Sequence, residues 1–171
     1  SEDGIQNMNS IFEKIQEQID RVIKQAFKVC GEKGVLPDIE PGEIVVEVPK
    51  ERDFGDFSTN IAMQVSKQAR MAPRKTAEFL LQELNLEGTY IEKVDVAGPG
   101  FINFFLQKDW LYDSVRLIQG KQENYGQIDL GKGIKVNVEF VSANPTGPLH
   151  MGNARGGALG DCLANVLKKA G

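Results

Sequence analysis

The feature that most constrains the fold is a change of hydrophobic period within residues 134–167. From Ile134 to Phe140 the even positions are apolar and the odd positions are Lys, Asn and Glu, which is the two-residue period of a strand. Two prolines and a glycine in 142–148 stop any strand or helix there. Apolar residues then return at helical spacing, at Leu159, Leu163, Val166 and Leu167. This order predicts the first βα unit of a nucleotide-binding α/β domain, with the loop at the carboxyl end of the strand.

His150 is the only histidine of the chain, and it lies where the predicted helix begins. Small residues follow it, namely Gly152, Ala154, Gly156 and Gly157. They would let a ligand approach the helix start closely, and free N–H groups there favour phosphates. An imidazole at this place can donate a hydrogen bond to phosphate oxygens as charge develops on them. The spacing is equally compatible with a structural loop in which the histidine merely caps the helix.

The loop residues resemble the first signature of class I aminoacyl-tRNA synthetases, and their longer form resembles that of arginyl-tRNA synthetases. The signature residues are Ala143, Asn144, Pro145, Thr146, Gly147, Pro148, Leu149, His150, Met151, Gly152 and Asn153. Two positions depart from the family pattern. Met151 replaces an isoleucine and keeps its size and apolarity, whereas Asn153 replaces a second histidine and keeps only the capacity for hydrogen bonding.

The resemblance implies ATP-dependent ligation of arginine to tRNA(Arg) through an arginyl-adenylate. It assigns ATP contacts to His150, Gly152 and Asn153. It assigns arginine contacts to Glu139, Ser142, Asn144 and His150. ATP is expected as a substrate with Mg²⁺, without a structural metal in the protein. A carboxylate is the natural partner of a guanidinium, but Glu139 taken alone also fits a solvated strand residue or a surface ion pair.

Composition indicates an ordinary globular protein, with 41% apolar and 26% charged residues in 171. Cys30 and Cys162 lack metal-ligand spacing. No apolar run of membrane-spanning length and no signal peptide is visible, so we expect a cytoplasmic location. Residues 131–171 carry five Lys/Arg against two Asp/Glu, a charge of +3, which leaves −7 for residues 1–130. Any RNA contact must therefore use local basic patches.

Residues 1–7 are interpreted as remnants of cloning ahead of a start at Met8. The expected elements after it are a helix from Met8 to about Gly31, a strand at Ile44–Val48, a helix at about Asn60–Arg70 capped by Ser58 or Thr59, a helix from Pro73, strands at Ile91–Val96 and Phe101–Leu106, and a helix from Asp109 to about Leu117. This order predicts a small α+β domain with a mainly antiparallel sheet. We expect that domain at 8–120, a glycine-rich linker at 121–133, and the truncated start of a Rossmann-like catalytic domain at 134–171.

The first domain resembles the additional amino-terminal domain of arginyl-tRNA synthetases in Phe54–Asn60 and Ala97–Phe105. That resemblance implies contact with the tRNA elbow, with Phe101 and Asn103 at a D-loop base. An aromatic ring can stack on a base and an amide can bind its edge. Without the resemblance, Phe101 fits an ordinary core residue as well. The sequence also has a basic cluster of Lys67, Arg70, Arg74 and Lys75. The default interpretation is a solvated helix corner, and the alternative is a contact for RNA phosphate.

Several expectations concern the chain as a whole. Its parent is expected to be a monomeric ligase, and the 171-residue chain alone is expected to be inactive. One alternative is a non-catalytic tRNA-binding module with a relic signature; another is a class I synthetase for a different amino acid, which Glu139 and the 144–149 run oppose. The apolar residues of 134–170 are expected to find burial against 8–118 or through exchange with a second copy.

Overall fold

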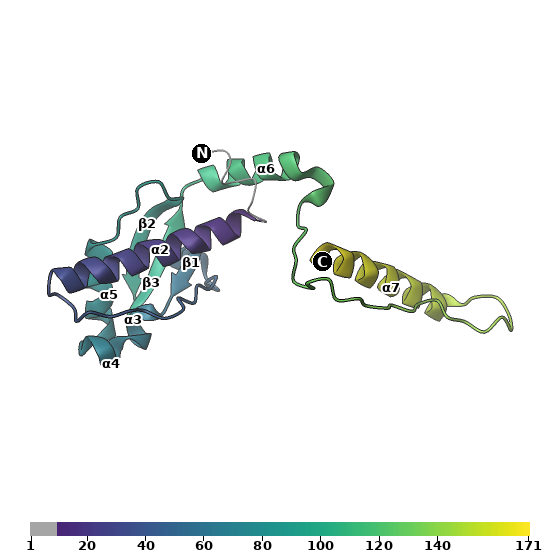
Figure 1. Ribbon diagram of the computed structural model, residues 1–171, viewed down its shortest axis with the longest axis horizontal. Helices are drawn as coiled ribbons and strands as arrows, with labels where there is room; N and C mark the ends of the chain where they lie inside the picture. The colour runs from purple at the N-terminus through teal and green to yellow at the C-terminus, as the bar shows by residue number, and fades with distance from the viewer. Residues whose placement is uncertain (1–9) are drawn as a thin grey trace. The chain divides into compact units, whose positions relative to one another are not determined.

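The computed structural model describes residues 10–171 and divides the chain into two compact units, the first ending at Leu117 and the second spanning Ile118–Gly171. The interpretation of residues 1–7, and of Met8 as a start, lies outside the described residues. The first unit contains α2 (Ile11–Glu32), the 3-10 turn η1 (Arg52–Phe54), β1 (Phe57–Thr59), α3 (Ile61–Gln64), α4 (Ser66–Ala69), α5 (Pro73–Gln82), β2 (Ile91–Ala97), β3 (Phe101–Leu106) and most of α6 (Asp109–Lys121) (Figure 1).

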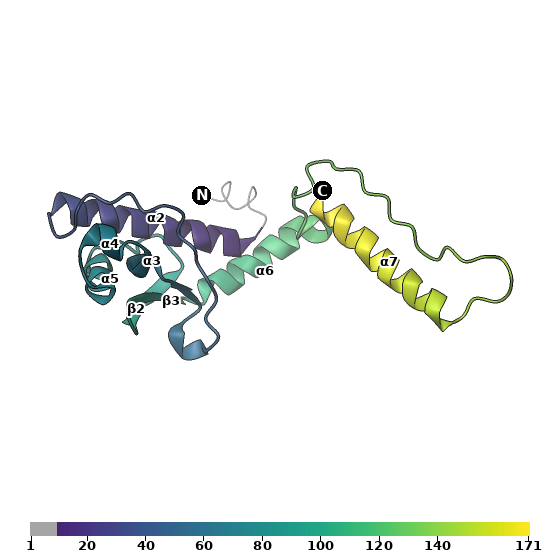
Figure 2. The ribbon, with the colours of Figure 1, turned by 90° about the horizontal axis from the view of Figure 1, so that it is seen from below.

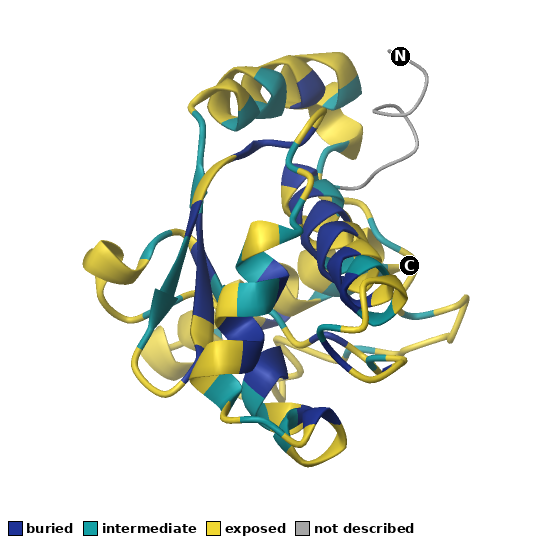
Figure 3. Ribbon diagram, turned by 90° about the vertical axis from the view of Figure 1, so that its left-hand side faces the viewer, coloured by how far each residue is buried: buried dark blue, intermediate teal, exposed yellow. Residues whose placement is uncertain are grey.

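The sheet of the first unit has the strand order β1-β3-β2, with both neighbouring pairs antiparallel. β3 is central, and its Ile102 and Phe104 are fully buried. Helices α2, α3 and α5 gather beside the sheet (Figure 2), and their buried residues face it (Figure 3). This arrangement confirms the α+β prediction for the first unit, with one helix-covered sheet face and one core.

Helix α2 supplies the largest share of that core. Ser10 caps it, since its side chain accepts a hydrogen bond from the Glu13 backbone N–H at 3.2 Å. Its buried residues recur every three or four positions: Ile11, Ile15, Ile19, Val22, Ile23, Ala26 and Phe27. This is the apolar stripe of a helix that packs on a sheet. The helix predicted from the same spacing is therefore confirmed, from Ile11 to Glu32.

Three expectations for residues 44–70 were wrong in detail. The strand at Ile44–Val48 is reduced to one bridge between Glu47 and Ser58, because the Val45 carbonyl is bound by a side chain and not by a backbone N–H of β1. The helix at 60–70 is split at Val65 into α3 and α4. Ser58 and Thr59 belong to β1 and cap no helix. Thr59 instead donates its hydroxyl to the Val45 carbonyl at 2.8 Å.

Later elements of the first unit agree better with the sequence. α5 begins at Pro73, a residue suited to the first helical turn. β2 and β3 form the predicted hairpin around Gly98–Gly100. α6 extends four residues beyond the predicted end, to Lys121.

The second unit holds η2 (Gln122–Asn124) and α7 (Met151–Ala170), joined by an extended segment. The helix predicted after the signature loop is confirmed. The strand predicted at 134–140 is not formed, because a strand needs a hydrogen-bonded neighbour and the sheet of the described residues comprises only β1, β2 and β3. The residues before it are tied to the end of α7, where the Ile128 N–H donates to the Lys169 carbonyl at 2.9 Å.

Candidate nucleotide and RNA sites

His150 is the N-cap of α7, the 20-residue helix that follows the signature loop. Its Nδ1 accepts a hydrogen bond from the Gly152 N–H at 3.1 Å. In the neutral imidazole the other nitrogen, Nε2, then carries the proton and is a donor. The capping role that the sequence left open is thus present. It does not exclude ligand binding, because the free Nε2–H is exposed beside the positive end of a long helix dipole.

Asn153 completes this cap, since its Oδ1 accepts a hydrogen bond from the His150 N–H at 3.1 Å. The pair forms a capping box, in which the side chain of each residue accepts a hydrogen bond from a backbone N–H at the other's position in the first turn. The asparagine at this family position thus serves as a hydrogen-bond acceptor in the cap. The Asn153 amide nitrogen keeps its two donors for other contacts.

A hollow of about 500 Å³ opens at this helix start, and both His150 and Asn153 line it. The remaining lining is small or apolar, from Val141, Leu149, Met151, Ala154 and Gly157. Val141 has a backbone φ of +59°, which is unusual for a β-branched residue. Such residues cost roughly 1–3 kcal/mol and persist where the surroundings hold them. The chain turns here from the extended segment into the signature loop.

Of the four predicted arginine-binding residues, His150 lines the hollow, whereas Glu139, Ser142 and Asn144 lie outside it. The Ser142 hydroxyl donates a short hydrogen bond to Glu139 Oε1. The Asn144 carbonyl accepts from the Thr146 N–H at 2.8 Å, which shapes the proline-containing turn. All of these side chains are exposed, and none of them lines the hollow at His150. Among the predicted site residues, Glu139 is therefore hydrogen-bonded to Ser142, and His150 is hydrogen-bonded to Gly152 and Asn153.

Phe101 and Asn103 lie on β3, on the sheet face opposite Ile102 and Phe104. Phe101 is 41% exposed and Asn103 only 3%. The Ser58 hydroxyl donates to Asn103 Oδ1 at 2.7 Å across the β1–β3 pair. Phe101 is thus not a core residue, which removes the alternative that the sequence left open. Asn103 is fixed through its oxygen and retains its amide donors.

Sequence reasoning missed Ser58, the residue that orients Asn103. A three-residue strand is too short for its period to be recognised. Gly55, two residues before β1, was also not singled out. It has a φ of +87°, and a Cβ there would lie 2.6 Å from the Phe104 carbonyl oxygen. Asp56 then clamps β3, since its N–H donates to the Phe104 carbonyl at 2.8 Å and its Oδ2 accepts from the Leu106 N–H at 2.8 Å.

Residues 10–171 contain no group of three or more His, Cys, Asp or Glu side chains placed to hold a metal ion. Within the same range no helix is both long and apolar enough to cross a membrane. Cys30 is buried and Cys162 is exposed, and both are free thiols. Burial raises the pKa of the Cys30 thiol, with a further contribution from Glu83. At neutral pH Cys30 is therefore protonated, which is the less reactive form.

Comparison with known proteins identifies the family. A model described as "Arginyl tRNA synthetase N terminal domain" matches residues 13–106. The chain is 57% identical over 164 residues to an arginine–tRNA ligase of Acetivibrio thermocellus, covering 96% of the chain and 29% of that protein. It is 54% identical over the same length to the arginine–tRNA ligase of Ruminiclostridium cellulolyticum. An arginyl-tRNA synthetase structure from Plasmodium falciparum shares the fold, with a TM-score of 0.51 at 23% identity over 87% of this chain and 28% of that one.

The chain belongs to the arginyl-tRNA synthetase family, and its first unit is that family's N-terminal domain. This confirms the resemblance carried by the signature loop and by the Phe54–Asn60 and Ala97–Phe105 segments. The chain spans 29% of the length of the curated relatives that it matches.

Proposed function

We propose that the protein to which this chain contributes is an arginine–tRNA ligase, which joins L-arginine to tRNA(Arg) with conversion of ATP to AMP and diphosphate. One observation carries the proposal. The 57% identity to a ligase extends over 164 of the 171 residues, so it includes the signature loop as well as the first unit. A protein that had kept only RNA binding would have no need of the capped helix start and its exposed imidazole donor.

The roles proposed for the loop follow from its geometry. His150 donates through Nε2–H to ATP phosphate oxygens as charge develops on them, with the start of α7 adding favourable dipole and free N–H groups. Gly152 keeps the approach free of side chains, and Asn153 fixes the cap from which His150 acts. Mg²⁺ enters with the ATP phosphates, as part of the substrate.

Glu139 is proposed to bind the guanidinium of arginine, with Ser142 and Asn144 contacting its backbone end. Ser142 already hydrogen-bonds one carboxylate oxygen of Glu139, which holds the carboxylate in one orientation. A guanidinium binds a carboxylate best through two parallel hydrogen bonds. In the complete enzyme residues 134–140 are proposed to become the first strand of a Rossmann-like sheet, which would place this loop at a strand end.

The first unit is proposed to bind tRNA through Phe101 and Asn103. Phe101 offers an exposed ring for stacking on an unpaired base, and Asn103 offers amide donors to a base edge. A second candidate function is favoured by the packing of this unit, which has its own core. It is a tRNA-binding module without catalysis, in which the loop is a relic.

The two candidates are separated by arginine-dependent exchange of ³²P-pyrophosphate into ATP. The protein of full natural length should catalyse the exchange, and His150→Ala should lower its rate by about 100-fold or more, as loss of an oxyanion donor does. The matched control is Met151→Leu, which keeps an apolar residue at the next position. Exchange that does not depend on His150, or tRNA binding without any exchange, would favour the module.

A further inference from the structure

The corner between α4 and α5 concentrates positive charge in an acidic unit. Residues 61–82 carry four Lys/Arg against one Glu, whereas residues 1–130 together carry a charge of −7. Lys67, Arg70, Arg74 and Lys75 are all exposed. A polyanion therefore meets a local excess of positive charge here, in a part of the chain that is otherwise net negative.

Three of these cations have no partner of opposite charge within the part of the chain that the structure describes. Arg74 pairs with Glu78, at 3.1 Å from Nε to Oε1. The ion pairs found among residues 10–171 do not include Lys67, Arg70 or Lys75. By contrast, Lys24 of α2 pairs with Asp20 at 2.8 Å. Exposed cations that no carboxylate neutralises remain available to phosphate groups.

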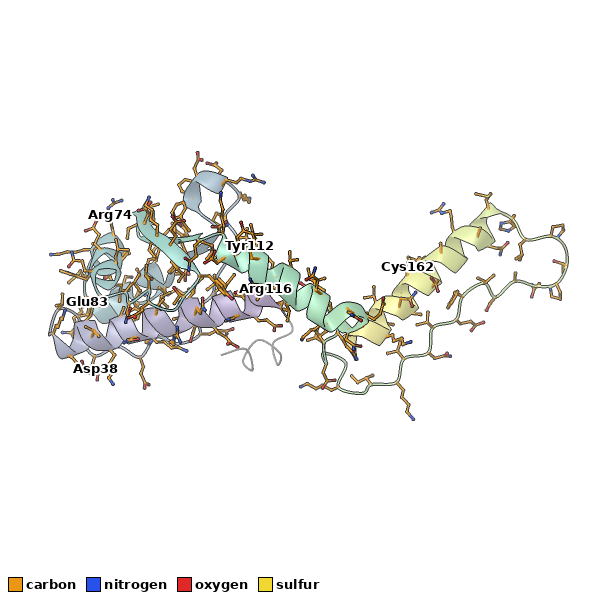
Figure 4. All side chains as sticks on the ribbon, turned by 90° about the horizontal axis from the view of Figure 1, so that it is seen from above. Asp38, Arg74, Glu83, Tyr112, Arg116 and Cys162 are labelled. Carbon is orange, nitrogen blue, oxygen red and sulfur yellow. The ribbon has the colours of Figure 1, made fainter. Side chains whose placement is uncertain are left out.

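The same corner is joined to the exposed ring of Phe101. Arg74 Nη1 donates to the Gly98 carbonyl at 3.0 Å, and Figure 4 shows Arg74 at this end of the unit. Gly100 has a φ of +135°, and a Cβ there would lie 2.8 Å from the Pro73 carbonyl carbon. The hairpin tip therefore rests directly on the start of α5. Phe101 follows Gly100 directly, so the strand that carries this ring begins at the contact with α5.

We propose that Lys67, Arg70 and Lys75 form a phosphate-binding corner for RNA that acts together with Phe101. The ring stacks on an unpaired base while the cations hold backbone phosphates of the same RNA loop, which is the combination that single-stranded RNA requires. Arg74 has a different part, since its bonds to Glu78 and Gly98 hold the corner on the hairpin. The proposal rests on the proposed function, because it takes the RNA to be tRNA(Arg).

The test measures binding of the 171-residue chain to a tRNA(Arg) transcript by fluorescence anisotropy between about 50 and 200 mM salt. The corner variant is Lys67→Gln/Arg70→Gln/Lys75→Gln. The control variant, Arg21→Gln/Lys24→Gln/Lys28→Gln, removes one arginine and two lysines from exposed positions of α2. The corner variant should bind about tenfold or more weakly, and its slope of log affinity against log salt should fall by about two, at roughly 0.7 for each lost phosphate contact. The control variant should keep the slope of the unmodified chain.

The possible outcomes separate the two proposals. If Phe101→Ala weakens binding and the corner variant matches the control, the phosphate corner is wrong and the proposed tRNA contact stands. If the unmodified chain binds tRNA no better than duplex DNA of equal length, both fail. If the corner variant loses the same factor of affinity for tRNA and for duplex DNA, the proposed corner is also wrong, since these cations would then bind any polyanion. Unchanged melting temperatures of both variants should show that the comparison is not affected by unfolding.

Discussion

The two units of this chain differ in what holds them together. In the first, α2, α3, α5 and the sheet enclose side chains that are fully buried, among them Ile15, Ile19 and Phe104. In the second, residues 118–171 are all described, and Gly160 is the one buried residue. Large apolar side chains such as Leu159 and Val166 stay 72% and 64% exposed there. The first unit is therefore stabilised by a core of its own, whereas the unit with the signature loop has almost no buried side chains.

The largest expected effect tests that contrast directly. Phe104→Ala should lower the free energy of unfolding of the 171-residue chain by about 3–5 kcal/mol, because it empties the centre of the first unit. Leu163→Ala, in α7, should change it by less than about 0.5 kcal/mol, because Leu163 is 47% exposed. Urea denaturation followed by circular dichroism provides the measurement. Comparable losses for both variants would mean that α7 is packed in solution and that the contrast is wrong.

The arginine site proposed for the second unit is tested in the protein of full natural length. Glu139→Gln should raise the Michaelis constant for arginine more than tenfold, because an unpaired guanidinium at a buried site costs about 2–5 kcal/mol. The Michaelis constant for ATP should change by less than about twofold. Glu123→Gln, an exposed acid in the same unit, serves as the control. If the arginine constant moves less than about threefold, Glu139 does not bind the substrate guanidinium.

The sequence predicted the first unit, which has a core, better than the second unit, which lacks one. The period of α2 and of the β2–β3 hairpin could be recognised because each element buries its own apolar face. β1 was missed because Ser58 and Thr59 resemble helix caps, and only pairing with β3 makes them a strand. The 134–140 segment has a clear strand period but no neighbour to pair with. A two-residue period alone therefore does not produce a strand where the described residues offer no partner for it.

The candidate site shows a similar limit. The position of His150 at a helix start followed from the prolines that precede it and the helical spacing of apolar residues after it. Its cap with Asn153 did not, because a capping box depends on which side chains turn back to the backbone. The burial of Asn103 beside an exposed Phe101 was also not predictable, since alternation places both on one face without saying what covers each.

A smaller effect concerns the helix that joins the two units. Tyr90 is 7% exposed and donates its hydroxyl to Asp113 Oδ2 of α6 at 2.7 Å, while Lys14 donates to the same hydroxyl at 3.2 Å. Tyr90→Phe should cost about 1.5–3 kcal/mol, since a bond to a charged acceptor is lost. Tyr112→Phe is the control, because Tyr112 of α6 is 63% exposed.

The cost should also depend on pH. Burial, with the hydrogen bond to Asp113 as a second cause, raises the pKa of Tyr90 well above its ordinary value. A raised pKa means that the stabilisation is complete below the unfolded value of about 10 and is lost as pH rises through the folded one. The difference in unfolding free energy between the unmodified chain and Tyr90→Phe should therefore be constant from pH 7 to 9 and shrink above about pH 10. A difference that grows above pH 10 would show that the hydroxyl is not held in its protonated form.

The smallest expected effect tests the RNA contact proposed for the first unit. Ser58→Ala removes the hydroxyl that holds Asn103 Oδ1, so the amide can turn and its donors lose their fixed direction. Affinity for tRNA(Arg) should fall about two- to tenfold, equal to roughly 0.5–1.5 kcal/mol. Ser58→Thr should keep the affinity, because it retains the hydroxyl and suits a strand. In an Asn103→Ala background Ser58→Ala should have no further effect on binding. A loss that persists without Asn103 would assign Ser58 a contact of its own, and the open face of the sheet would then bind RNA by a different set of side chains.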